Sequence, residues 1–74
     1  MYEQQTSFVD RLVREKERKE ITSVSRTTAW QLEKLGLYPK RRKLHPTSDA
    51  VCWLLSELLE WVQAREIADG GHHE

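Results

Sequence analysis

The sequence predicts a small α+β domain of the winged helix-turn-helix type, and three observations lead to this fold class. Two short helix-forming stretches are separated by a few small polar residues at 22–25. A strongly basic segment followed by turn-forming residues comes next, as in a β-hairpin. A last stretch carries apolar residues at helical spacing. The expected order is therefore a short helix, a recognition helix, a basic hairpin (the wing) and a C-terminal helix.

The chain of 74 residues has room for one domain, which we place at 10–69. Residues 1–9 show little periodicity and are expected to form a flexible tail, as are residues 70–74 after the last helix. A chain this small buries too little surface for a deep substrate cavity. It also has no Ser/His/Asp grouping and no glycine-rich phosphate loop, so we do not expect an enzyme.

The cysteine and histidine residues predict neither a disulfide nor a metal site. Cys52 is the single cysteine, which favours an intracellular protein. The spacing of His45, His72 and His73 relative to Cys52 does not preset a tetrahedral metal site, so no metal and no other cofactor is expected. No apolar run approaches the roughly 18 residues of a membrane span, and no signal peptide is recognisable. We therefore expect a cytoplasmic protein without membrane contact.

The first helix is expected at 15–22. In residues 10–14, which precede it, apolar and charged residues alternate over too few positions to distinguish a short edge strand from the start of a helix. The stretch 15–22 is rich in helix formers but has one apolar residue, Ile21. It therefore predicts a short, exposed helix with a thin inward face.

The second helix is expected from Arg26 onward. Ser25 is a preferred N-cap, and Gly36 can take the positive φ that ends a helix. Thr28 with Gln31 forms a rival capping-box pattern, but it leaves a helix of barely two turns, so we prefer Ser25. The apolar residues of this helix recur every three positions and predict an inward stripe of Ala29, Leu32 and Leu35.

A hairpin and a third helix complete the predicted domain. Residues 42–44 and 50–54 are the expected arms of the hairpin, and 46–49 supply its turn. Ser56 is expected to cap the third helix, with Glu57 near the positive end of its dipole, and this helix should last until Asp69. Its inward face is expected to carry Leu58, Trp61, Val62 and the stem of Arg65, with Leu59 at the edge.

The three tryptophans are interpreted mainly as core residues. Trp53 and Trp61 are expected to cover the hairpin, because each supplies a large area to a small core. Trp30 is expected to be half exposed, close to the backbone of bound DNA.

Charge is strongly uneven along the chain although the net charge is zero. Residues 11–44 carry eleven Lys or Arg and four Glu, whereas residues 45–74 carry one Arg and six acids. A basic block of this size is the electrostatic footprint of a protein that binds a polyanion, although charges also serve simply to solvate a small domain.

The candidate DNA-binding residues lie on the second helix and on the first arm of the hairpin. Arg26 is expected to contact guanine or a phosphate, and Gln31 can pair bidentately with adenine. For Ser25 and Thr28, ordinary capping is preferred over base contact. The run 40–43 is expected to grip phosphates, the alternative being an edge strand protected by charge. The candidate site comprises Ser25, Arg26, Thr27, Thr28, Gln31, Lys34, Lys40, Arg41, Arg42 and Lys43.

The order of these features resembles the AlpA family of phage and prophage regulators, small relatives of the MerR-type winged helix-turn-helix. The resemblance spans about 11–65 and rests on 11–14, 24–32, 36–40, 43–44, 50–58 and 60–62. The chain departs from the family at Arg18 and Lys19, where aliphatic residues are usual, and at Ser23, where glycine is usual. Its hairpin tip, 45–49, also looks longer.

The resemblance implies a sequence-specific regulator of prophage or mobile-element genes that binds double-stranded DNA. The implied location is the bacterial cytoplasm, at the nucleoid when the protein is bound to DNA. An excisionase-like factor that bends DNA is an alternative. So is a protein-interaction adaptor, because the apolar surplus at Leu55 and Leu59 could receive a partner helix or a second copy of the chain.

Overall fold

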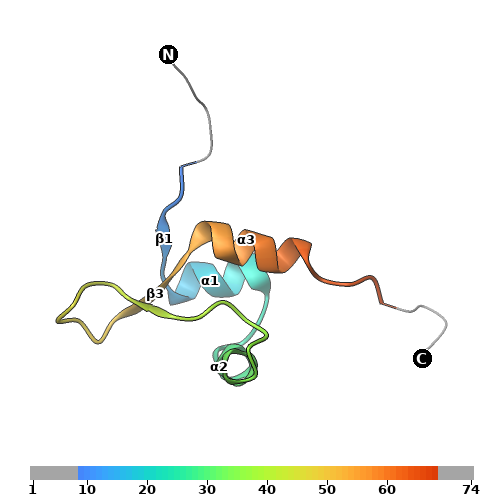
Figure 1. The fold of residues 1–74 in the computed structure, drawn as a ribbon, viewed down its shortest axis with the longest axis horizontal. Coiled ribbons are helices and arrows are strands. Elements are labelled where there is room, and N and C mark those ends of the chain that lie inside the picture. The colour runs from blue at the N-terminus through green and yellow to red at the C-terminus, as the bar shows by residue number, and fades with distance from the viewer. Residues whose placement is uncertain (1–8, 69–74) are drawn as a thin grey trace, which may run out of the picture.

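The computed structural model describes residues 9–68. Their elements follow the order β1 (Leu12–Val13), α1 (Glu15–Thr22), α2 (Arg26–Lys34), β2 (Arg42–Lys43), β3 (Val51–Leu54) and α3 (Leu55–Gln63). Helices α1 and α3 pack side by side, while α2 is viewed end-on beneath them and the β2–β3 hairpin projects to one side (Figure 1). The predicted α+β winged helix-turn-helix is confirmed. The tails expected at 1–9 and 70–74 lie outside the described residues, except for Val9.

The three strands form one small antiparallel sheet with the order β1-β3-β2. Leu12 of β1 pairs with Leu54, and Val13 pairs with Trp53. Since neighbouring residues of a strand face opposite sides, Val13 is fully buried while Leu12 remains exposed. The segment for which the sequence left strand and helix open is therefore a strand. The β2–β3 pairing confirms the predicted hairpin.

Helix α1 has the predicted bounds, but the prediction that it is simply exposed is wrong. Arg18 has no exposed surface, and Thr22 is also buried, whereas Ile21 is only partly buried. The Arg18 guanidinium donates to Glu15, to the carbonyl of Val24 (2.9 Å) and to the hydroxyl of Tyr38 (3.0 Å). One side of α1 is thus buried through hydrogen bonds between polar side chains, and a hydropathy pattern does not predict burial of this kind.

Helix α2 begins as predicted, because the Ser25 hydroxyl accepts from the Thr28 amide at 3.2 Å. It ends at Lys34, and Gly36, with φ of 75°, follows the C-cap: here the Leu37 amide donates to the Leu32 carbonyl and the Gly36 amide to the Glu33 carbonyl. Leu35 does not belong to the inward stripe, since it is 70% exposed. A three-residue step falls short of a full turn by about 60°, so Leu35 has rotated about 120° away from Ala29.

Helix α3 is capped by a distant residue rather than by Ser56. Its N-cap position is Leu54, and Ser56 already lies in the first turn. Asp10, which precedes β1, accepts from both the amide (3.0 Å) and the hydroxyl (2.7 Å) of Ser56. The predicted C-terminal limit is also wrong: the helix ends at Gln63 instead of continuing to Asp69, and Ile67, the apolar residue beyond this end, is 99% exposed and stabilises no further turn.

The core is built around Val13, Ala29, Tyr38, Trp53 and Leu58. Trp53 is buried as predicted. The ring of Trp61 packs edge-on against that of Tyr38, with centroids 5.0 Å apart, rather than covering the hairpin. No helix in the described part of the chain is long and apolar enough to cross a bilayer.

Candidate nucleic-acid interface

The outer face of α2 collects the candidate residues that were expected to reach DNA. Ala29 is buried and Leu32 packs against the core, and these contacts turn the opposite side of the helix outward. A groove of about 460 Å³ lies along this side. Its lining consists of four candidate residues and one tryptophan: Arg26, Thr27, Trp30, Gln31 and Lys34. All four candidates are exposed, so the face offers two cations and two hydrogen-bonding side chains to a ligand.

Ser25 and Thr28 are engaged with one another at the start of α2. The Ser25 hydroxyl accepts from the Thr28 amide and donates to the Thr28 hydroxyl at 3.0 Å. Both residues are exposed, but their polar atoms already stabilise the helix terminus. The interpretation of these two residues as capping residues agrees with this geometry.

The four consecutive cations of the wing are directed to different places. Arg41 donates through Nε to Glu33 of α2 at 2.9 Å, whereas Arg42 donates to Glu57 of α3 at 2.9 Å. The hydrogen bond and charge of Glu57 raise the pKa of Arg42. Lys40 and Lys43 are exposed and form no ion pair within residues 9–68. Arg41 is therefore paired with an acid of α2, and Arg42 with an acid of α3.

Trp30 was expected to be half exposed, but its contacts with two arginines were not predicted from the sequence. The guanidinium carbons of Arg26 and Arg41 lie 4.6 Å and 4.3 Å from the centroid of its ring. The indole is partly buried and packs against the core. Sequence reasoning also missed Glu33, which holds Arg41, because nothing in the local pattern brings together residues eight positions apart across the end of a helix.

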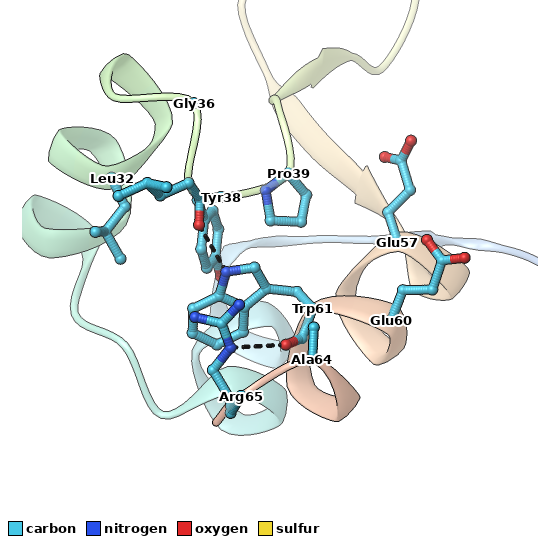
Figure 2. A pocket seen from close by; sticks show the side chains of 10 residues that line it. Leu32, Gly36, Tyr38, Pro39, Glu57, Glu60, Trp61, Ala64 and Arg65 are labelled. Carbon is cyan, nitrogen blue, oxygen red and sulfur yellow. Dashed lines mark hydrogen bonds between the residues drawn. The ribbon is translucent and has the colours of Figure 1, made fainter. Parts of the chain in front are cut away.

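A second, more apolar groove of about 700 Å³ lies between α3 and the segment that follows α2. Figure 2 shows Tyr38, Pro39 and Trp61 in this groove, with Glu57 and Glu60 on one side. The Trp61 indole donates to the Leu37 carbonyl at 2.7 Å, and the Arg65 guanidinium lies 3.9 Å from the Trp61 ring centroid. Trp61, which lines the groove, is therefore held in place by contacts with Leu37 and Arg65 of the same chain.

The apolar surplus expected on α3 is smaller than the sequence suggested. Leu55 packs against the core and is partly buried, so it offers less apolar surface to a partner than expected. Leu59 and Val62 are 37% and 38% exposed. No group of three or more His, Cys, Asp or Glu residues gathers within residues 9–68 in a way that could hold a metal ion.

A comparison with known protein families identifies a relationship over most of the chain. A family model described as "Prophage CP4-57 regulatory protein (AlpA)" matches residues 11–66. This range contains all six helices and strands of the structure. No curated protein and no solved structure matches the chain.

Proposed function

The chain belongs to the AlpA family of prophage regulatory proteins, and from this premise we propose that it regulates prophage or mobile-element genes by binding specific sites on double-stranded DNA. The observation that carries the proposal is the outer face of α2, where Arg26, Thr27, Gln31 and Lys34 are exposed together. A helix of this width fits the major groove of B-DNA. Regulation through DNA contact needs no reaction at the protein surface, so an enzymatic role is not proposed.

Within this proposal, the exposed residues of α2 divide into two kinds of contact. Gln31 and Thr27 lie on the groove face and carry groups that can hydrogen-bond to base edges. Lys34, one turn further along, is suited to a phosphate because a flexible ammonium contacts charge without reading sequence. Base contacts supply specificity, and phosphate contacts position the helix.

The wing is proposed to contact the DNA backbone beside the recognition helix. Lys40 and Lys43 support this role because both are exposed and neither is paired with an acid among the described residues. Arg42 contributes less in this arrangement, since Glu57 already compensates its charge.

The experiment is fluorescence anisotropy of the purified chain with random duplex DNA and with fragments that flank its own gene, at two salt concentrations. Salt-sensitive binding that favours particular fragments supports the proposal, because phosphate contacts release counterions and base contacts discriminate between sequences. Equal binding to all duplexes contradicts sequence-specific regulation. Absence of binding even at low salt contradicts DNA binding altogether.

A further inference from the structure

Two arginines from different elements converge on one indole at the edge of the α2 groove. Arg26 is the first residue of α2, and Arg41 immediately precedes β2. Their guanidinium carbons lie 4.6 Å and 4.3 Å from the ring centroid of Trp30, so they cannot be further from each other than about 9 Å. Both distances are within the range of cation–π contacts, which is roughly 6 Å.

The charges of this cluster are only partly compensated. Glu33 pairs with Arg41 through its Nε atom at 2.9 Å, and the Glu33 side chain is mostly buried. The terminal amino groups of Arg41 and all guanidinium groups of Arg26 have no hydrogen bond to another described residue. Glu15 also interacts with the charge of Arg26, but it is itself paired with Arg18. The two arginines therefore keep a net positive charge, to which Lys34 in the same groove adds a second.

The indole orients the two arginines and does not itself supply a donor. Nε1 of Trp30 is shielded from solvent and finds no acceptor among the described residues. The ring therefore interacts with the two arginines through its π system, and a planar guanidinium held close to an aromatic ring has fewer orientations available to it. Arginines fixed in this way lose less freedom when they bind a tetrahedral oxyanion.

We propose that Arg26 and Arg41, oriented by Trp30, form a clamp that binds one backbone phosphate of duplex DNA, so that Arg26 positions the recognition helix and does not read a base. The proposal rests on the DNA-binding function proposed above and deepens it. It assigns Arg41 to the same phosphate as α2 rather than to the phosphates gripped by the wing. The proposal also assigns Arg26 to a phosphate rather than to guanine.

The test compares salt slopes of Arg26→Ala, Arg41→Ala and the double variant by anisotropy on the preferred duplex. The slope of log affinity against log salt changes by about 0.9 for each phosphate that is no longer neutralised. If both arginines share one phosphate, each single variant weakens binding about fivefold to tenfold with little change of slope. The double variant then lowers the slope by about 0.9, once and not twice.

The control is Arg65→Ala, which removes a comparable arginine from the ring of Trp61 on α3. This variant should leave both affinity and slope unchanged. Circular dichroism and urea unfolding of each variant check that the fold is retained, which is expected because Arg26 and Arg41 are exposed.

Two results would overturn the clamp while leaving DNA binding intact. If each single variant lowers the slope by about 0.9 and the double variant lowers it by twice that amount, the arginines contact separate phosphates. If Arg26→Ala changes which base is preferred at one position of the site, Arg26 reads a base. Failure of the unmodified chain to bind any duplex instead overturns the proposed function itself, and the clamp with it.

Discussion

Arg18 shows how a single residue holds this small core together. Burial lowers the pKa of a guanidinium, but the hydrogen bonds to Glu15 and Tyr38 more than offset this effect and raise the pKa of Arg18, so it is charged. The guanidinium also lies 5.9 Å from the ring centroid of Tyr38 and 5.4 Å from that of Trp53. One side chain therefore connects α1, the turn before α2, the segment after α2 and β3.

Arg18→Ala should destabilise the fold strongly. It leaves the Val24 carbonyl and the Tyr38 hydroxyl without their donor and opens a cavity, and loss of one partner from a buried pair costs about 3 kcal/mol or more. Urea unfolding followed by circular dichroism measures the change. Lys19→Ala, at the exposed neighbouring position of α1, is the control and should cost less than about 0.5 kcal/mol. Equal effects of the two variants would refute the structural role of Arg18.

Gln31 is the residue for which we expect a change of specificity rather than of stability. It is exposed in the α2 groove, and its side chain has no hydrogen bond to a described residue. Gln31→Ala should reduce discrimination at one base pair by about 1–3 kcal/mol. Anisotropy with a set of single-base variants of the preferred site measures this change. If affinity falls equally on every sequence, Gln31 does not take part in base readout.

At the scale of elements, the start of α3 depends on a residue from the other end of the domain. Asp10 accepts two hydrogen bonds from Ser56, and these bonds lower the pKa of the Asp10 carboxyl below its ordinary value of 3.8. A similar relation holds for Glu15, whose pKa is lowered chiefly by the hydrogen bonds from Arg18. Both carboxylates therefore stabilise the folded state only while they are ionised.

Stability should consequently fall as the pH drops below about 4. A carboxyl whose pKa is lower in the folded state contributes stability above its unfolded pKa and loses that contribution as it is protonated. Asp10→Asn should reduce the pH dependence of the unfolding free energy between pH 5 and 2, measured by urea unfolding at several pH values. Glu20→Gln, which removes an exposed carboxylate of α1, serves as the control. Identical pH profiles for the unmodified chain and Asp10→Asn would contradict the proposed cap.

The wing is an element in which neighbouring cations are expected to act differently. Combined Lys40→Ala and Lys43→Ala substitutions should weaken binding to all duplexes and lower the salt slope by about 0.9 for each lost phosphate contact. Arg42→Ala is the matched control, because its charge is already paired with Glu57, and it should change the slope less. An unchanged slope in the double lysine variant would refute the wing as a backbone contact.

At the scale of the whole molecule, the distribution of apolar surface bears on the oligomeric state. Leu55 is used by the core, and the two apolar residues of α3 that remain exposed, Leu59 and Val62, are each less than two fifths exposed. We therefore expect no dimer to form through α3 when the chain is sedimented without DNA across a concentration series. A dimer that is lost on Leu59→Lys would instead support a second copy of the chain as partner. Such a dimer would require paired half-sites on DNA.

The features of this protein that depend on neighbouring residues could be predicted from the sequence. The bounds of α1, the Ser25 cap, the Gly36 stop and the hairpin were all predicted correctly, because capping and turn chemistry act within a few residues. The family was also recognisable from the order of short motifs, and the match over residues 11–66 confirms it.

The contacts between distant residues could not be predicted in this way and are visible only in the folded chain. Asp10 caps α3 across 46 positions, Arg18 reaches Tyr38 across 20, and Arg41 reaches the indole of Trp30 from beyond the end of α2. The burial of Arg18 and the exposure of Leu35 likewise depend on what lies opposite each side chain. Periodicity assigns faces by hydropathy, whereas a buried charge is stabilised by partners that only the folded chain brings within hydrogen-bond distance.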